Sequence, residues 1–435
     1  MQRITFFLAC LVMTPATAWA GLYYSGEPMA ELPSRWRGYL LDHQLLRTLA
    51  AQPKPGQPEN PLRAQYVKHA EKLEKKRQQN KLNANEAADL GALHIRLGRT
   101  DKAIEVLEQA SRQHPKHFKI AANLGTAWQL QGELQRALGY LQTAVSLAPK
   151  DKKEMETHHL KLVLLRLREK ADAGKLDNLF GVDFASPKAK YEAGKLAEAE
   201  KAKLPKNAVA VAQQLSLWLP ADSRLLWQLA EIANAFGDIR MAANMMDGLV
   251  TQYNLRNPAL LQHRRIIKLA VKELPAVTIG SQTNHKKHVG GLLAKSKRPL
   301  LTKLDTSILP PITATGTNRM PWALLKETEV GSKFRPKFDN YLQKLGGKRV
   351  TLNGFMQPFS DELDVTSFMF LEYPVGCWYC EMPEITSIIL IETPKGETAT
   401  YTRGLVRVSG ELTLNSTDPE EFFYIIRNAQ VGGVD

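Results

Sequence analysis

The chain has 435 residues, of which 44% are apolar and 23% are charged. These proportions are typical of globular proteins and exclude both an intrinsically disordered chain and one that is fully embedded in a membrane. The formal net charge of +14 favours acidic partners, such as anionic polymers or lipid head groups, although excess Lys and Arg can also simply solvate helix faces. A chain of this length has room for two or three domains with buried cores.

The first twenty residues, MQRITFFLACLVMTPATAWA, have the pattern of a secretory signal peptide. Arg3 precedes an apolar stretch and small residues flank Trp19, so we expect cleavage after Ala20. Cys10 lies inside the apolar stretch, where a lipoprotein processing site is the alternative to an ordinary cysteine removed with the leader. The rest of the chain has no run of about 20 apolar residues that could span a membrane. The sequence therefore predicts a soluble exported protein, most simply a periplasmic one, for which nucleic acid is not an expected partner.

Residues 21–83 form an extension after the predicted leader. An amphipathic helix is predicted over residues 34–50, beginning at Ser34, and a Pro-rich loop over residues 52–61 separates it from a charged helix over residues 62–82. We expect this extension to cap the helical region that follows.

An internal repeat comes next. The stretch AADLGALHIRLGRTDKAIEVLEQASRQHP, residues 87–115, aligns with AANLGTAWQLQGELQRALGYLQTAVSLAP, residues 121–149. Glycine and alanine recur at fixed positions in both stretches, and such small residues allow two helices to approach closely. A proline, which ends a helix, recurs as well. The residues that recur 34 positions later are Leu90, Gly91, Gly98, Ala103, Ala110 and Pro115.

This spacing resembles the tetratricopeptide repeat, which has two antiparallel helices per unit. A third unit begins at residue 223 with SRLLWQLAEIANAFGDIRMAANMMDGLV, and degenerate helical pieces precede it. We therefore expect a solenoid of four or five units over residues 84–254.

The resemblance implies that the concave face, formed by the first helix of each unit, binds a protein or peptide partner. Ala88 and Ala92 occupy the Lys and Asn positions of one well-known peptide-carboxylate clamp, so that clamp is not expected here. The candidate partner-binding residues on the concave face are Arg96, Lys119, Asn123 and Gln129.

Residues 255–318 are basic and contain Gly-Gly and Pro breaks, so we interpret them as a linker with one short helix. Contact with an anionic envelope surface is one role for such a linker. Its HKKH stretch contains His285 and His288.

The apolar period changes from that of a helix to that of a strand in the last part of the chain, residues 319–435. A helix predicted over residues 334–345 leads into five strand-like runs, at 349–359, 367–374, 387–394, 404–414 and 421–431. The predicted fold class is therefore a multidomain α-then-β chain, in which a tetratricopeptide α-solenoid precedes a small five-stranded β-barrel or sandwich. An oligonucleotide-binding barrel has a similar shape.

This β domain also resembles a family of uncharacterised exported bacterial domains. Many members of that family have a histidine two residues after a cysteine in a Pro-rich turn, and they occur beside transport or metal-handling genes. This chain has Tyr379 at that position and adds Cys380. The matching residues are Pro321, Trp322, Gly347, Val350, Leu352, Gly354, Pro358, Phe368, Phe370, Cys377, Pro383, Val406, Val408, Gly410 and Leu412.

Cys377 and Cys380, in the turn CWYC, are the only cysteines outside the predicted leader. The pair has three interpretations: a redox couple, half of a tetrahedral zinc site, or a disulfide that pins the turn. Pro383 and an apolar strand follow closely, which disfavours the helix N-terminus that activates a thioredoxin-type pair. Further ligands for zinc would have to come from Glu381, Glu384, His285 and His288.

The sequence has no motif of a nucleophile elbow, a zinc protease, a P-loop or a dinucleotide fingerprint. The predicted function is therefore that of a non-enzymatic, exported interaction scaffold whose solenoid binds a protein or peptide partner and presents the β module. The alternative is a periplasmic metal- or thiol-handling protein that uses the Cys377/Cys380 turn, with zinc as its only cofactor.

Overall fold

The computed structural model describes residues 22–27, 39–51, 60–169, 175–184, 190–274, 304–331, 335–360, 362–374, 383, 385–418 and 421–434. Several predictions fall outside these residues. They concern the leader with Cys10, the two histidines His285 and His288, and the turn residues Cys377, Cys380, Glu381 and Glu384.

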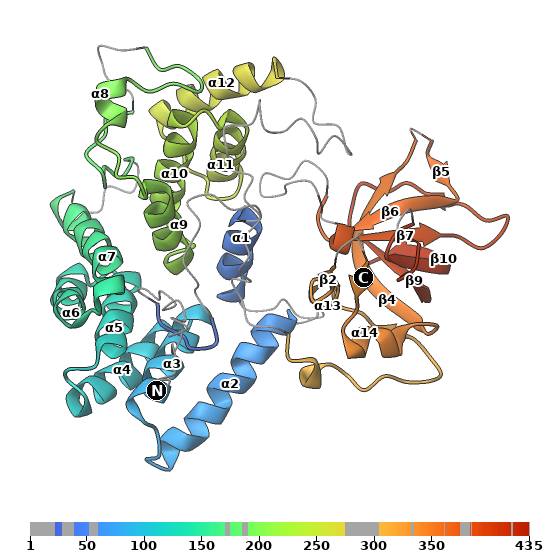
Figure 1. Cartoon of the computed structure of the whole chain (residues 1–435), viewed down its shortest axis with the longest axis horizontal. Coiled ribbons are helices and arrows are strands. Elements are labelled where there is room, and N and C mark those ends of the chain that lie inside the picture. The colour runs from blue at the N-terminus through green and yellow to red at the C-terminus, as the bar shows by residue number, and fades with distance from the viewer. Residues whose placement is uncertain are drawn as a thin grey trace, which may run out of the picture.

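The N-terminal part of the chain is helical, and its helices share one continuous apolar core (Figure 1). Consecutive helices pack against each other along most of this part, and α1 packs on α9. The helices are α1 (Tyr39–Leu49), α2 (Pro61–Gln78), α3 (Ala84–Arg96), α4 (Thr100–Gln113), α5 (Phe118–Leu130), α6 (Leu134–Leu147), α7 (Lys150–Arg168), α8 (Glu198–Lys201), α9 (Ala208–Trp218), α10 (Ser223–Ala235), α11 (Ile239–Thr251) and α12 (Pro258–Lys272).

The predicted repeat units are helix pairs: α3 with α4, α5 with α6, and α10 with α11. Glycine is required where the two helices of a unit meet. A Cβ atom on Gly91 would lie 2.4 Å from Cγ of Leu107, and one on Gly125 would lie 2.7 Å from Cγ of Leu141. A side chain at either position would therefore require the facing leucine, or the helix that carries it, to shift. The tetratricopeptide geometry thus follows from the small residues of the repeat.

The helical part extends beyond the predicted solenoid in both directions. The charged helix α2 packs against α3, in the position expected of a capping extension. At the other end, the region predicted as a basic linker begins with α12, which packs against α11 and buries Leu260, His263 and Ile267. Because its apolar residues recur with helical period, this segment belongs to the helical core and not to a linker.

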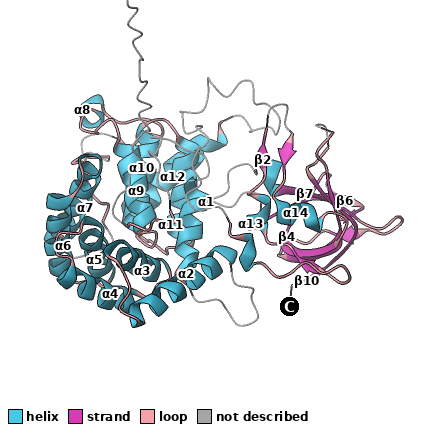
Figure 2. Cartoon of the chain, turned by 60° about the horizontal axis from the view of Figure 1, so that its bottom comes forward, coloured by secondary structure: helices cyan, strands magenta, loops and turns pink. Residues whose placement is uncertain are grey.

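The C-terminal part is a β-barrel (Figures 1 and 2). Five strands close in the order β4-β6-β7-β10-β9, and β9 pairs back onto β4. Strands β7 and β10 are parallel, whereas the other neighbours in the barrel are antiparallel. The five strands are β4 (Arg349–Pro358), β6 (Ser367–Leu371), β7 (Ile388–Glu392), β9 (Val406–Leu414) and β10 (Tyr424–Gly433). The predicted five-stranded fold is confirmed, as a closed barrel.

Short elements complete the barrel domain. Strand β1 (Asn318–Arg319) pairs in parallel with β4, β2 (Glu329–Val330) pairs with β3 (Pro336–Lys337), and β5 (Asp364–Val365) pairs with β8 (Ala399–Thr400). Two 3-10 turns, η1 (Thr306–Ile308) and η3 (Ile385–Ser387), and helix α13 (Trp322–Leu325) lie around it.

Helix α14 (Asn340–Leu345) is shorter than the helix predicted over residues 334–345. Its start is fixed by Asp339, whose side chain accepts a hydrogen bond from the amide of Tyr341. The residues just before this cap are extended instead and form β3. A side chain that caps a helix therefore set the boundary here.

The two parts of the chain touch at α2 (Figure 2). The amide of Asp305 donates to Oε1 of Gln65 over 3.3 Å, and Nζ of Lys68 lies 3.8 Å from Oδ2 of Asp305. These contacts are few and exposed, so they contribute little to stability.

Candidate functional site

The candidate site is the inner face of the first repeats, where a short segment of the same chain lies. This N-terminal segment comprises residues 22–27, Leu-Tyr-Tyr-Ser-Gly-Glu, and is dark blue in Figure 1. It forms neither helix nor strand, yet Leu22, Tyr23, Tyr24 and Glu27 are buried. The residues that hold it come from α2, α3, α5 and α7.

Asn123 on α5, one of the predicted groove residues, is fully buried beneath the segment. Its Oδ1 accepts from the amide of Tyr23 over 2.7 Å, and its Nδ2 donates to the carbonyl of Tyr23 over 3.1 Å. The same Nδ2 donates to the carbonyl of Ala88 on α3 over 2.9 Å. Asn123 therefore pairs with both the N–H and the C=O of Tyr23. Such a pairing recognises the main chain of a polypeptide whatever side chain the bound residue carries.

Arg96, the last residue of α3 and a second predicted groove residue, forms a fork with the carboxylate of Glu27. Its Nε donates to Oε1 over 3.0 Å and its Nη2 donates to Oε2 over 2.8 Å. Both side chains are almost completely buried. Tyr66 of α2 donates a further hydrogen bond of 2.7 Å to Glu27, and Nη1 of Arg96 donates to the carbonyl of Leu217 over 2.6 Å. A buried, bidentate pair of this kind gives strong geometric specificity for a carboxylate.

The middle of the segment is held by Asp89 on α3. Both the amide and the hydroxyl of Ser25 donate to its carboxylate, the amide over 2.9 Å. Burial raises the pKa of Asp89, while the Ser25 hydrogen bonds and the nearby charge of Lys119 act in the opposite direction. Lys119, the third predicted groove residue, is half-buried in the first turn of α5. Its ammonium group lies close enough to Asp89 to favour the charged form of that carboxylate.

Two tyrosine rings anchor the segment by packing. The ring of Tyr23 meets the ring of Phe118 edge-on at 4.7 Å, and its hydroxyl donates to Glu156 of α7 over 2.9 Å. The ring of Tyr24 meets the ring of Tyr66 at 5.4 Å, and its hydroxyl bonds to His69 of α2. The rings supply apolar area, and each hydroxyl finds a partner in the groove wall.

Gln129, the fourth predicted groove residue, lies deeper along α5 and does not contact the segment in any hydrogen bond of the described residues. Its Oε1 lies 2.7 Å from Nε2 of His159 on α7. Burial lowers the pKa of His159 to about 3, so its ring is neutral at physiological pH. Gln129 thus links two repeats next to the site.

Three of the predicted groove residues, Arg96, Lys119 and Asn123, meet or neighbour the segment. The sequence analysis did not identify the segment itself, nor Asp89, Tyr66 and Glu156. A signal was present, because two adjacent tyrosines follow closely after the predicted cleavage point in a stretch without helical or strand period. Aromatic residues in such a stretch need a surface elsewhere on which to pack.

A buried polar cluster elsewhere in the helical part is structural. The carboxylate of Glu231 on α10 accepts from Tyr191 over 2.8 Å and from Trp227 over 3.0 Å, and it lies 2.7 Å from Nδ1 of His263 on α12. The rings of Tyr191 and His263 are stacked at 3.6 Å. With its oxygens used in this way, Glu231 ties α12 to the helical core.

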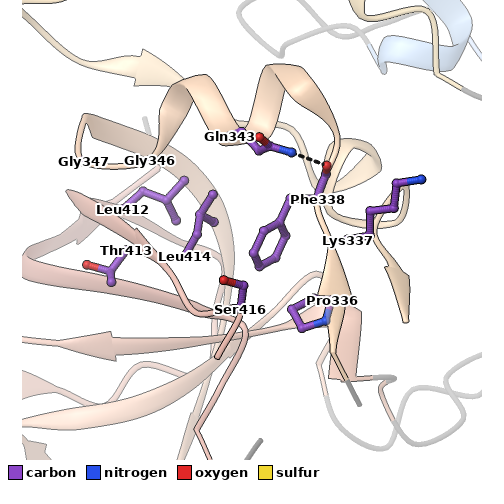
Figure 3. A pocket seen from close by; sticks show the side chains of 10 residues that line it. All are labelled: Pro336, Lys337, Phe338, Gln343, Gly346, Gly347, Leu412, Thr413, Leu414 and Ser416. Atoms are coloured by element: carbon purple, nitrogen blue, oxygen red, sulfur yellow. Dashed lines mark hydrogen bonds between the residues drawn. The ribbon is translucent and has the colours of Figure 1, made fainter. Parts of the chain in front are cut away.

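The barrel domain has an open cavity of about 690 Å³ between the β3–α14 corner and the end of β9 (Figure 3). Lys337 is the charged residue among those that line it, and the side-chain Nε2 of Gln343 donates to the carbonyl of Phe338 over 2.9 Å. This lining has no second titratable side chain, so it lacks an acid–base pair for chemistry.

No cluster of three metal-ligating side chains occurs among the residues that the structure describes, and none of their helices is long and apolar enough to cross a membrane. The zinc ligands suggested by the sequence (Cys377, Cys380, Glu381, Glu384, His285 and His288) lie outside the described residues, so the zinc and disulfide hypotheses stay predictions.

The fold and the site define a helical-repeat protein with a C-terminal β-barrel. Residues 70–157 match the family model described as "Tetratricopeptide repeat", and residues 318–431 match "Protein of unknown function (DUF3299)". A crystal structure of a tetratricopeptide repeat protein from Parabacteroides merdae is 18% identical, covers 54% of this chain and 88% of its own, and has a TM-score of 0.26. No curated protein matches the chain significantly.

Proposed function

We propose that the protein is a non-enzymatic interaction scaffold that binds a non-helical segment of a partner polypeptide on the inner face of α3, α5 and α7, and presents the β-barrel to the complex. Tetratricopeptide repeats commonly mediate protein interaction, and stacked repeats provide extended concave binding surfaces.

The observation that carries this proposal is the pair of hydrogen bonds from Asn123 to the backbone of Tyr23. A side chain that satisfies both the N–H and the C=O of one residue is a device for holding a polypeptide chain. The neighbouring Asp89 and Arg96 add one acceptor and one fork-shaped donor for the polar groups of such a chain.

We further propose that the protein is exported, with its leader removed after Ala20 and its site of action in the periplasm. The N-terminal segment would then begin within a few residues of the mature N-terminus. No observation among the described residues favours the alternative function in metal or thiol handling.

Site-specific photo-cross-linking tests the proposal. A photoreactive amino acid replaces Lys119 or Gln129 in the groove, and in a matched control it replaces Gln109, which is exposed on α4. In cells that express the full chain, the two groove positions should form the same polypeptide adducts and the control should not. Adducts that are absent from both groove positions, or equal at Gln109, would contradict an interaction function of this face.

A further inference from the structure

The N-terminal segment has the properties of a bound ligand. It contributes no helix or strand to the fold, and side chains of four helices hold it by contacts to its backbone, its rings and its carboxylate. The segment turns at Ser25 and Gly26, where the amide of Glu27 donates to the carbonyl of Tyr24 over 3.0 Å. A side chain at Gly26 would collide with the ring of Tyr24, at 2.5 Å from its Cζ.

We propose that this segment is an intramolecular ligand of the repeat groove, and that the partner binds by displacing it with a segment of the same chemistry. That chemistry is two adjacent aromatic residues, a small residue and glycine that form a tight turn, and a carboxylate three positions after the second aromatic residue. This inference rests on the proposed function, because it names the class of partner for the same face of the solenoid.

Each position of the segment has its own recognition group in the groove. The first aromatic ring packs on Phe118, and the backbone beneath it pairs with Asn123. The turn is read by Asp89, which accepts from a backbone amide and a hydroxyl. The final carboxylate enters the fork of Arg96, which would be left buried and uncompensated by a segment that lacked an acid. The groove therefore selects for an acid at the last position.

Occupation by the chain's own segment lowers the apparent affinity for any partner. When a site is free for only a fraction of the time, the apparent dissociation constant is the intrinsic constant divided by that fraction. A change that weakens the internal segment without altering the groove should therefore tighten the binding of an added peptide. A change in the groove itself weakens the internal segment and the added peptide alike, so its two effects on the apparent dissociation constant oppose each other.

The test uses the full mature chain and the peptide Leu-Tyr-Tyr-Ser-Gly-Glu, acetylated, amidated and labelled with a fluorophore. Glu27→Gln weakens the internal segment and leaves every groove residue unchanged, so this variant should bind the peptide about tenfold more tightly than the wild type, as expected for the loss of a charge-assisted fork. A peptide with alanine in place of the final glutamate should bind about tenfold more weakly to the same variant.

Tyr23→Phe, which removes only the hydroxyl bonded to Glu156, serves as the second weakened variant if Glu27→Gln does not fold. Two results would overturn the inference: equal binding of the glutamate and alanine peptides, or no binding to a folded variant of the internal segment. Cross-linked partners at the groove together with absent peptide binding would leave the proposed function standing and refute only the displacement of the segment. Peptide binding without any cross-linked partner would refute the proposed function and leave the displacement of the segment standing.

Discussion

Replacing Gly91 by alanine should destabilise the helical part, although alanine is the better helix former. The new Cβ would lie 2.4 Å from Cγ and 2.5 Å from Cδ2 of Leu107, which is fully buried in the helical core. Overpacking of a closed core costs about 1–3 kcal/mol, and so short a contact belongs at the upper end of that range. The gain in helix propensity recovers about 1 kcal/mol. We therefore expect a net loss of about 2 kcal/mol in the free energy of unfolding.

Gly139→Ala is the matched control. Gly139 is also inside a helix, α6, but it is exposed, and a Cβ there would meet no atom within 4 Å. This variant should be stabilised by about 1 kcal/mol. Thermal unfolding followed by circular dichroism should show the melting temperature falling by about 4–8 °C for Gly91→Ala and rising by about 2–4 °C for Gly139→Ala. Shifts of the same sign in both variants would refute the close helix contact.

Three further predictions concern other parts of the fold. Burial holds the pKa of His43 and of His159 near 3, well below the unfolded value of about 6.5. Between these two pH values the unfolded chain thus binds more protons than the folded chain, so the free energy of unfolding should fall as the pH falls from about 6.5 towards 3. In urea unfolding, His43→Leu should make the free energy of unfolding depend less on pH. Glu231→Leu would leave the buried hydrogen-bond donors of Glu231 without an acceptor, so the free energy of unfolding in the same assay should fall by at least about 3 kcal/mol. A fall below about 1 kcal/mol would argue against the network. Gly354→Ala would place a Cβ atom 2.6 Å from the carbonyl oxygen of Leu371. This variant should speed hydrogen exchange in the barrel strands and leave the exchange rates of α1 to α12 unchanged.

The elements that sequence reasoning located are those whose signals are local. The repeat was visible because glycine and alanine recur where helices must touch, and the barrel strands were visible because apolar residues alternate, as in the burial pattern of β4. The closure of the barrel was not visible, since it depends on which strands pair, including the parallel pair β7 and β10.

The occupied groove also lay beyond local signals. Asn123 was identified from its place on an inner helix, but its partner Tyr23 is 100 residues away in a stretch without period. Helix α12 was absorbed into a predicted linker because the basic, Gly- and Pro-containing stretch after it dominated the composition. For the groove, the deciding interaction is a tertiary contact between distant segments. For α12, the helical period of its own apolar residues was the signal, and the helix packs on its neighbour α11.

The central claim is that residues 22–27 are a displaceable ligand of the repeat groove. Residue-resolved hydrogen exchange of the mature chain tests it most directly, because the amides of Tyr23 and Ser25 are bonded to Asn123 and Asp89 of the groove. We expect both amides to exchange through a local opening, faster than the amides within α5, and to exchange faster still when the peptide is added in excess. Exchange of both amides at the rate of the α5 amides, with no response to the peptide, would show that the segment is a fixed part of the core and would contradict the claim.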